Sequence, residues 1–313
     1  MSSLVLHHYP ASPFSEKVRL AFGYKGLAWK SVLIPAVMPK PDLMPLTGGY
    51  RKTPVMQFGA DVYCDTQLMM CELDRRYPDC PLLPAAGQAS AEAMADWADH
   101  TLFLHGVAIA FQPAGMESFA AALTADELAR FQQDRASFMD GLRPPSLAVA
   151  QARFAFWMDR LQQQLSDGGP WLFGEHPTVA DFAVAHPLWF IVSREKLAHT
   201  LDPWPKVAEW LQAMTALGHG TEHRFGADEA LALARESEPA PLPDGGSEDP
   251  GGLRPGDEVS VVATDYGRDP VVGELVYTSP ERVIIRRTTP ETGVVHVHFP
   301  RVGFALEVAS GAG

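Results

Sequence analysis

The pattern of apolar and polar positions changes character twice along the chain. Residues 1–80 combine short apolar runs with helix-like spacing, residues 86–236 repeat apolar side chains every three or four positions, and short strand-like runs return over residues 253–309. Residues 237–252 are polar and rich in proline and glycine, so they have little apolar surface to bury. The pattern predicts three domains, with a linker before the last one.

The first domain, residues 1–80, is predicted to be mixed α/β. The order expected from the spacing is strand–helix–strand followed by strand–strand–helix, which resembles a thioredoxin-like domain. The predicted strands cover 4–9, 29–34, 55–58 and 62–64, and the predicted helices run from 13 to about 25 and from 65 to about 77.

The second domain, residues 86–236, is predicted to be all-α. Thr178 and Asp181 have the spacing of a capping box, in which the two side chains satisfy backbone donors at a helix start. Trp157 belongs to an amphipathic stripe and is interpreted as a core residue. Helices are expected at about 94–104, 123–139, 147–165, 204–214 and 227–235.

The third domain, residues 253–309, is predicted to be a small antiparallel β-barrel of five short strands separated by turn signals. It holds six arginines against three Asp and five Glu, a net charge of −2, whereas a nucleic-acid-binding barrel is normally basic. The fold class is therefore α+β multidomain. The strands are expected at 259–263, 271–277, 283–287, 294–299 and 304–308.

Composition narrows the function class. The 313 residues are 46% hydrophobic and 20% charged, as in ordinary globular proteins, and the net charge of −13 argues against nucleic acid as a partner. We find no signal peptide and no apolar run of membrane-spanning length, so no membrane partner is expected. The three cysteines, Cys64, Cys71 and Cys80, are sparse and odd in number. This usage fits a reducing compartment and predicts a cytoplasmic protein.

The junction between the first strand and the first helix carries the first candidate chemistry. Ser12 occupies the N-cap position and Pro13 the first helical position. One interpretation is that Ser12 only caps the helix. The other is that its oxygen accepts the capping bond while its proton is donated to an anion such as a thiolate, beside the positive end of the helix dipole.

Two motifs resemble the glutathione transferase family. The run S-P-F-S-E-K-V-R at residues 12–19 is similar to the amino-terminal site of the bacterial, serine-type members, and T-V-A-D at 178–181 is similar to the buried capping box of their helical domain. The resemblance covers residues 1 to about 235 and excludes the third domain. It implies that Ser12 donates its hydroxyl to the glutathione sulfur, and that the protein is a homodimer. Tyr9, near the end of the first strand, remains an alternative donor.

The resemblance also implies residues that bind glutathione. Lys40 is expected to be an exposed cation in the loop before Pro41. The resemblance implies that it meets the glycine carboxylate, and a merely solvated lysine is the alternative. Pro54 matches a cis proline, and the backbone of Thr53 pairs with the cysteinyl part of glutathione; an ordinary edge proline is the alternative. Phe14 belongs to the same motif as Ser12.

Asp65 and Thr66 stand where the family usually has Glu-Ser or Asp-Ser, which bind the γ-glutamyl group. Thr66 keeps the hydroxyl, and a helix N-terminus supplies backbone donors for a carboxylate. The alternative is that Asp65 is simply an N-cap. Phe103, His105 and Phe111 on the first helix of the second domain are candidates for the acceptor pocket, or else are core residues.

These features predict a glutathione transferase that conjugates the glutathione thiolate to a small electrophile, with detoxification as its role. Alternatives are a glutathione-dependent disulfide reductase or peroxidase, and a non-catalytic binding scaffold whose C-terminal barrel recruits a partner. A reductase that works through its own thiol is disfavoured because serine stands at position 12. Glutathione is the expected co-substrate. No metal is expected, since His296 and His298 share a strand face without an evident third ligand.

Overall fold

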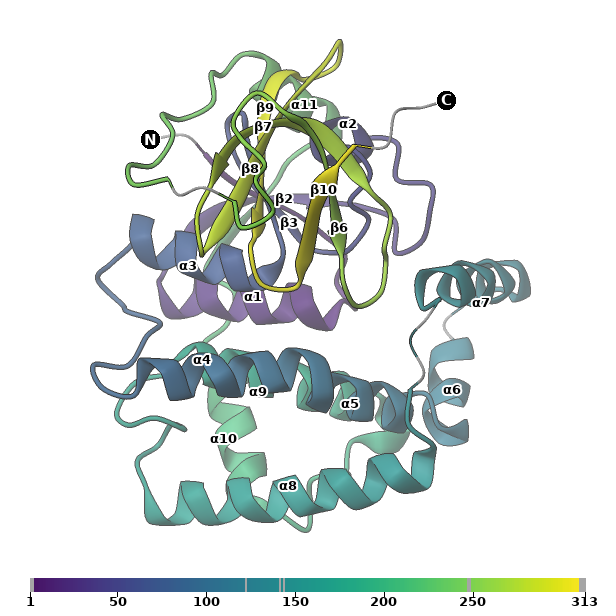
Figure 1. Ribbon diagram of the computed structural model, residues 1–313. Helices are drawn as coiled ribbons and strands as arrows, with labels where there is room; N and C mark the ends of the chain where they lie inside the picture. The colour runs from purple at the N-terminus through teal and green to yellow at the C-terminus, as the bar shows by residue number, and fades with distance from the viewer. Residues whose placement is uncertain (1–2, 122, 141, 143, 247–248, 310–313) are drawn as a thin grey trace.

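A single ten-stranded sheet runs through the molecule in the order β10-β6-β7-β8-β9-β4-β3-β1-β2-β5. The computed structural model describes residues 3–121, 123–140, 142, 144–246 and 249–309, so residues 247 and 248 of the predicted linker lie outside the described part. The sheet forms one layer, and a helical layer lies against it (Figure 1). Within the described residues, we find no helix both long enough and apolar enough to cross a membrane.

The N-terminal part has the predicted thioredoxin-like order. Strand β1 pairs in parallel with β2 and antiparallel with β3, which pairs antiparallel with β4. Helices α1 and α3 cover the face toward the helical layer (Figure 1). The elements are β1 (Leu4–His8), α1 (Pro13–Tyr24), β2 (Ala28–Leu33), α2 (Met44–Thr47), β3 (Val55–Phe58), β4 (Asp61–Cys64) and α3 (Thr66–Arg76).

The helical layer confirms the predicted all-α part. Asp181 accepts hydrogen bonds from the backbone of Thr178 at 2.8 Å and of Leu172 at 2.9 Å, and from the Trp210 indole at 3.0 Å. The buried capping box therefore fastens three segments of this layer. Its helices are α4 (Gln88–Trp97), a π-helical turn (Ala98–Leu102), α5 (Phe103–Ala110), α6 (Pro113–Ala120), α7 (Ala125–Phe138), α8 (Leu147–Asp167), α9 (Val179–Val192), a 3₁₀ turn (Glu195–Leu197) and α10 (Pro205–Ala216).

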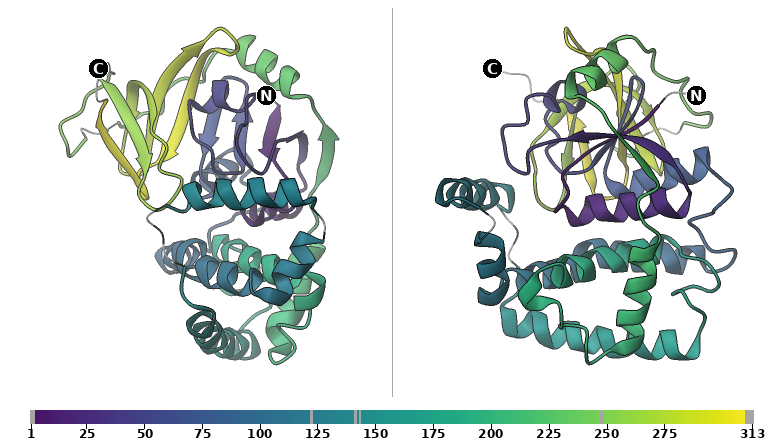
Figure 2. Two further views of the ribbon diagram at one scale, coloured as in Figure 1. Left: turned by 90° about the vertical axis from the view of Figure 1, so that its right-hand side faces the viewer. Right: turned by 180° about the vertical axis from the view of Figure 1, so that it is seen from behind.

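The C-terminal region confirms five strands, but they do not close into a barrel. Among the described residues, β10 pairs with β6, while β9 pairs in parallel with β4 of the N-terminal part. The C-terminal strands curl beside the N-terminal ones, and both sets share one sheet (Figure 2). The pairing covers an edge of β4 that would otherwise expose unpaired backbone groups. The strands are β6 (Glu258–Ala263), β7 (Val271–Thr278), β8 (Arg282–Thr289), β9 (Gly293–Pro300) and β10 (Phe304–Val308).

Strand β5 (Thr221–Arg224) was not predicted. It pairs in parallel with β2 and forms the other end of the sheet, after which α11 (Ala227–Arg235) packs on β9. All four β5 side chains are exposed and polar, so the strand has no apolar period to detect. The chain thus returns from the helical layer to the sheet before the C-terminal region begins.

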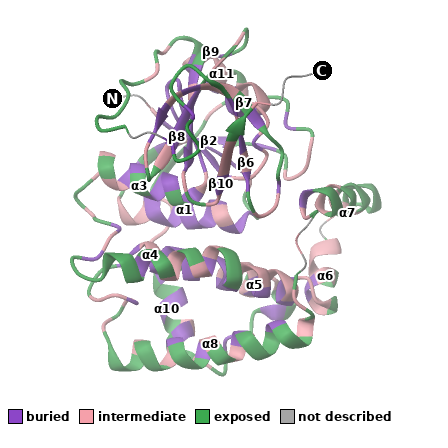
Figure 3. Cartoon of the chain, viewed as in Figure 1, coloured by how far each residue is buried: buried purple, intermediate pink, exposed green. Residues whose placement is uncertain are grey.

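Two hydrophobic cores hold the layers together. The first joins the α1 and α3 face of the sheet to the helical layer, through residues such as Phe22 and Phe182. The second joins the opposite side of the N-terminal strands to α11 and the C-terminal strands, through residues such as Val62 and Val297. Figure 3 shows buried residues concentrated in the sheet and on α1, with α7 largely exposed.

Candidate active site between the layers

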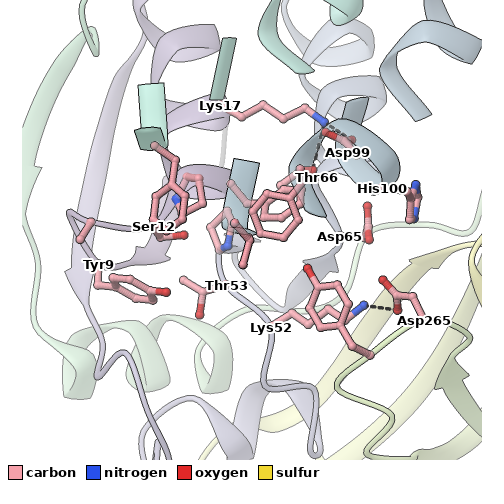
Figure 4. Close-up of a pocket in the computed structure, with 18 of the residues that line it drawn as sticks. Tyr9, Ser12, Lys17, Lys52, Thr53, Asp65, Thr66, Asp99, His100 and Asp265 are labelled. Carbon is pink, nitrogen blue, oxygen red and sulfur yellow. Dashed lines mark hydrogen bonds and ion pairs between the residues drawn. The ribbon is translucent and has the colours of Figure 1, made fainter. Parts of the chain in front are cut away.

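A cavity of about 1790 Å³ opens between the sheet and the helical layer. Small-molecule sites usually occupy about 300–1,000 Å³, so this cavity has room for two substrates together. Ten residues singled out above line it: Tyr9, Ser12, Phe14, Lys40, Thr53, Pro54, Asp65, Thr66, Phe103 and Phe111. Figure 4 shows Tyr9, Ser12 and Thr53 on one side of the opening, with Asp65 and His100 across from them.

Ser12 caps helix α1 as the sequence indicates. Its Oγ accepts a hydrogen bond from the Ser15 backbone at 3.2 Å, and its backbone N–H donates to the Tyr9 carbonyl at 3.1 Å. Arg19 donates to the Pro10 carbonyl at 2.9 Å, which fixes the turn that carries the serine. Because Oγ is used as an acceptor, the hydroxyl proton is available to a ligand at the positive end of α1.

Thr53 and Pro54 form the next wall. Their peptide bond is cis, in agreement with the family resemblance, and Pro54 is buried immediately before β3. The Thr53 Oγ1 accepts a hydrogen bond from Lys40 Nζ at 2.8 Å. The segment thus presents its backbone to the cavity from a fixed position.

The expectation that Lys40 is an exposed cation was wrong. Lys40 is 3% exposed, and its Nζ also donates to the Arg51 carbonyl at 2.8 Å. Burial, together with the charges of Arg135 and Arg51, lowers the pKa of Lys40 to about 7. An exposed loop was expected because the sequence around Pro41 is proline-rich, but the loop folds back over Arg51 and Thr53.

Asp65 and Thr66 meet the cavity at the start of α3. Asp65 has φ of 75°, unusual for a residue other than glycine, and its carboxylate caps the helix by accepting from the Gln67 backbone at 2.9 Å. Burial raises the pKa of Asp65, although the nearby Lys52 charge opposes this. The uncommon backbone geometry turns this carboxylate toward the cavity, where Figure 4 places it.

A buried network beneath Thr66 was missed by the sequence analysis. Lys17 Nζ donates to Thr66 Oγ1 at 3.1 Å and forms an ion pair with Asp99 at 2.5 Å, and Asp99 also bonds His186 at 2.9 Å. Asp99 lies in the π-helical turn of the helical layer, so the network ties the two layers at the cavity. Because Thr66 accepts from Lys17, its own proton is free for a ligand. Lys17 belongs to the motif at residues 12–19, but nothing in the sequence indicates Asp99 and His186 as its partners.

The aromatic wall comes from the helical layer. Phe103 packs edge-on against Phe14 with ring centroids 4.7 Å apart, and Phe111 contacts Phe119, Phe131 and Phe190 at centroid distances of 5.7 to 6.1 Å. These rings favour an apolar or aromatic ligand.

His105 does not join this wall. It lies on α5 but is buried and is absent from the cavity lining of the described residues. His105 is two residues after Phe103, about 200° further around the axis of the same helix, so the two side chains lie on opposite faces.

A cation of the helical layer also reaches the cavity. Arg194 lies over the Phe111 and Phe190 rings at 5.0 and 4.1 Å, and its pKa is lowered to about 10 by burial. Within the described chain, its Nε is buried without a hydrogen-bond partner. No motif in the sequence indicates Arg194, which lies two residues after the end of α9.

The C-terminal region supplies a further wall. The turn between β6 and β7 brings Asp265 to 2.5 Å from Lys52 Nζ, and Tyr266 lines the cavity beside it. Figure 4 shows this ion pair at the edge of the opening that holds Ser12 and Asp65. Sequence reasoning missed both residues because the C-terminal region was expected to be a separate barrel.

His296 and His298 acquire a third neighbour that the sequence did not reveal. Asp61 of β4 faces them across the β4–β9 pairing, and the possible ligand atoms of all three lie within 4.8 Å of one another. His298 bonds Asp61 at 2.8 Å, and the second Asp61 oxygen accepts from the Ala240 backbone at 2.8 Å. This cluster holds the linker and the two sets of strands together, and its residues do not line the cavity in the described part of the chain.

Comparisons with known proteins agree with this architecture. A model described as the glutathione S-transferase N-terminal domain matches residues 6–81, and one described as the glutathione S-transferase C-terminal domain matches residues 145–213. None of the curated proteins matches the chain.

Solved structures extend the likeness to the C-terminal strands. A GST-like protein from Pseudomonas syringae is 42% identical, with a TM-score of 0.83 over 98% of this chain and 100% of that protein. A glutathione S-transferase from Rhodospirillum rubrum is 20% identical, with a TM-score of 0.52 over 68% of this chain and 88% of its own. A beta-etherase from a Sphingobium strain is 16% identical, with a TM-score of 0.52 over 68% and 95%. The last two share the fold alone.

Proposed function

The chain belongs to the glutathione S-transferase family, and we propose that it conjugates the glutathione thiolate to an electrophilic carbon, with Ser12 as the donor to the sulfur. The observation that carries this proposal is the Ser12 hydroxyl in the cavity wall. The Ser12 oxygen already accepts the capping bond from the Ser15 backbone. Its proton can therefore be donated to an anion at the start of α1.

The neighbouring residues supply complementary groups for the rest of glutathione. In the proposed complex, the Thr53 backbone pairs with the cysteinyl residue. Asp65 receives the γ-glutamyl ammonium, while the Thr66 hydroxyl and the first N–H groups of α3 receive its carboxylate. Phe14 lines the same cavity and packs edge-on against Phe103.

Activation of the thiol accounts for only part of the proposed catalysis. A thiol with a pKa of about 8.5 is roughly 3% ionised at pH 7, and lowering that pKa by about two units raises the thiolate fraction roughly 24-fold. The weaker base is about 8-fold less nucleophilic at a Brønsted slope near 0.45, so the net gain is about threefold. Positioning of the electrophile against the sulfur therefore supplies the remainder.

The second substrate in this proposal is a small aromatic electrophile. The Phe103 and Phe111 side of the cavity offers rings and the Arg194 guanidinium, and the volume of about 1790 Å³ exceeds what glutathione alone would fill.

We propose detoxification of such compounds in the cytoplasm, by a homodimer. Light scattering on the purified protein measures the oligomeric state directly.

The test is product formation with three co-substrates. Wild type, Ser12→Ala and Tyr9→Phe are each mixed with glutathione and either 1-chloro-2,4-dinitrobenzene, hydroxyethyl disulfide or cumene hydroperoxide. We expect the aromatic conjugate from wild type and Tyr9→Phe, and a slower reaction from Ser12→Ala. Turnover of only the disulfide or the peroxide would replace conjugation by the reductase or peroxidase function. Failure to bind glutathione at millimolar concentration would leave the scaffold function.

A further inference from the structure

The turn of residues 265–267, between β6 and β7, is seated firmly against the cavity. Lys52 Nζ lies 2.5 Å from the Asp265 carboxylate and 4.3 Å from the centre of the Tyr266 ring. On the other side, the Tyr266 and Phe138 rings meet edge-on at 5.1 Å, and the Gly267 N–H donates to the Phe138 carbonyl at 2.9 Å. The turn therefore bridges the loop before β3 and the end of α7.

The fit of this turn requires glycine. Gly267 has φ of 59°, and a Cβ at this position would lie 2.6 Å from Phe138 Cε2 and 3.4 Å from Lys52 Cε. Backbone and neighbours thus fix the direction of the preceding tyrosine. Tyr266 is held between a cation and an aromatic ring, as a preorganised binding residue would be.

These contacts involve the ring of Tyr266 and not its hydroxyl. It lines the cavity, and within the described residues it makes no hydrogen bond. Burial and the charges of Asp265 and Asp65 raise the pKa of Tyr266 well above its ordinary value, so the phenol keeps its proton and acts as a donor. Its hydroxyl is not among the buried polar atoms that the described residues leave without a partner, so solvent reaches it and a ligand acceptor can take the place of that solvent.

Neighbouring charges indicate what kind of acceptor it is. Lys52 has three N–H donors, of which Asp265 takes one, so a cation and a phenol stand side by side next to Thr53. Such a pair suits a carboxylate. Asp265 compensates the Lys52 charge when the site is empty and holds the ammonium group beside the cavity.

We propose that the 265–267 turn of the C-terminal region completes the glutathione site, with Tyr266 donating its phenolic proton to a carboxylate of the bound tripeptide and Asp265 positioning Lys52. This inference rests on the proposed function, since it requires that glutathione occupies the cavity. It gives the C-terminal strands a role in binding and explains why they are attached to the sheet at β4 and not carried on a free linker.

The experiment is calorimetric titration of glutathione into wild type, Tyr266→Phe and Tyr277→Phe, together with steady-state kinetics. Tyr277 is the matched control, because it belongs to the same region and its hydroxyl bonds the Asp244 carbonyl at 3.4 Å, away from the cavity. Loss of a hydrogen bond to a charged group predicts about tenfold weaker binding for Tyr266→Phe. The KM for glutathione should rise equally, while kcat at saturation stays near the wild-type value.

Asp265→Asn provides the second test, with the exposed Asp269→Asn as control. A positioning role predicts a KM for glutathione raised about threefold with kcat unchanged, and a thermal midpoint equal to that of the control. Binding by Tyr266→Phe within threefold of Tyr277→Phe would overturn the inference while the proposed function stands. Absence of glutathione binding by the wild type would overturn both.

Discussion

The N-terminal strands and the C-terminal strands share one sheet and face one cavity, but they build its walls differently. In the N-terminal part, Ser12 and Thr66 stand at helix starts directly after strands, so local capping geometry aims them. In the C-terminal part, Asp265 and Tyr266 sit on a turn whose place is set by the pairing of β9 with β4, far away in the sequence. Residues close in the sequence therefore orient the reactive groups, whereas strand pairing between distant segments encloses the cavity.

Breaking the long-range pairing should have the largest effect. Val62 and Val297 are paired across the β4–β9 junction and are fully buried, so Val297→Asp puts an unpaired charge into the second core. We expect a loss of more than about 4 kcal/mol in the free energy of unfolding, measured by chemical denaturation. Val294→Asp is the matched control on the same strand, because Val294 is 39% exposed and should cost less than about 1 kcal/mol. Equal losses would contradict the role of the junction.

The electrostatic link between the two regions should have the next largest effect. Glu72 of α3 accepts from Arg75 at 2.5 Å and Arg76 at 2.5 Å, and lies 3.5 Å from Arg282 of β8. Although burial opposes ionisation, Arg75 and Arg76 of the same helix lower the pKa of Glu72 from 4.5 to about 2. The stabilisation is present above pH 4.5 and is lost as the pH falls toward 2, up to about 3 kcal/mol.

Glu72→Gln therefore should lower stability at pH 7 and flatten the stability profile between pH 4.5 and 2, as measured by denaturation at each pH. The exposed Glu274–Arg286 pair offers the control, since Glu274→Gln should change stability by less than about 0.5 kcal/mol. An unchanged acid profile in Glu72→Gln would show that the ionised Glu72 carboxylate does not stabilise the fold.

Two glycine substitutions distinguish the cost of backbone strain from the cost of a steric clash at the 265–267 turn. Gly267→Ala places a Cβ on a left-handed backbone and against Phe138. Gly252 also has a left-handed backbone, with φ of 81°, but a Cβ there would have no neighbour within 4 Å. We expect about 1 kcal/mol of destabilisation from φ alone in Gly252→Ala, and about 1 kcal/mol more in Gly267→Ala. Glutathione affinity should fall only in Gly267→Ala. Identical behaviour of the two variants would mean that the turn is not seated on α7.

The pH dependence of glutathione binding should differ between two lysines at the cavity, and this effect is expected to be modest. Lys52 is paired with a C-terminal carboxylate, whereas Lys40 is buried among N-terminal groups with a pKa of about 7. A protonated Lys40 favours the glycine carboxylate, so binding of S-methylglutathione should weaken about threefold as the pH rises through 7. Lys40→Met should remove this dependence, and Lys206→Met on α10 should keep it. A pH dependence that survives in Lys40→Met would assign the titration to another group.

Local signals explain why much of the fold and the glutathione side were predictable. Ser12 and Pro13 mark a helix start, Asp65 and Thr66 mark another, and Thr178 with Asp181 forms a capping box that the structure contains. Each is a pattern of a few neighbouring residues with one physical meaning.

Features that depend on distant contacts were not predictable in this way. Strand β5 has no apolar residue, and it exists because β2 offers an edge. Lys40 has the sequence context of a surface residue, but it is buried and its Nζ donates to the Arg51 carbonyl. Tyr266 reads as part of a turn, and only the β4–β9 pairing brings it to the cavity. Periodicity and composition contain no information about such partners.

Whether the Ser12 hydroxyl acts on the sulfur is tested most directly by the thiol pKa of bound glutathione, measured from thiolate absorbance against pH in wild type and Ser12→Ala. We expect a pKa about two units below the free value of about 8.5 in wild type, and a return toward 8.5 in the variant. If both proteins bind glutathione with the same thiol pKa, Ser12 is only a helix cap and the proposed role of its hydroxyl is wrong.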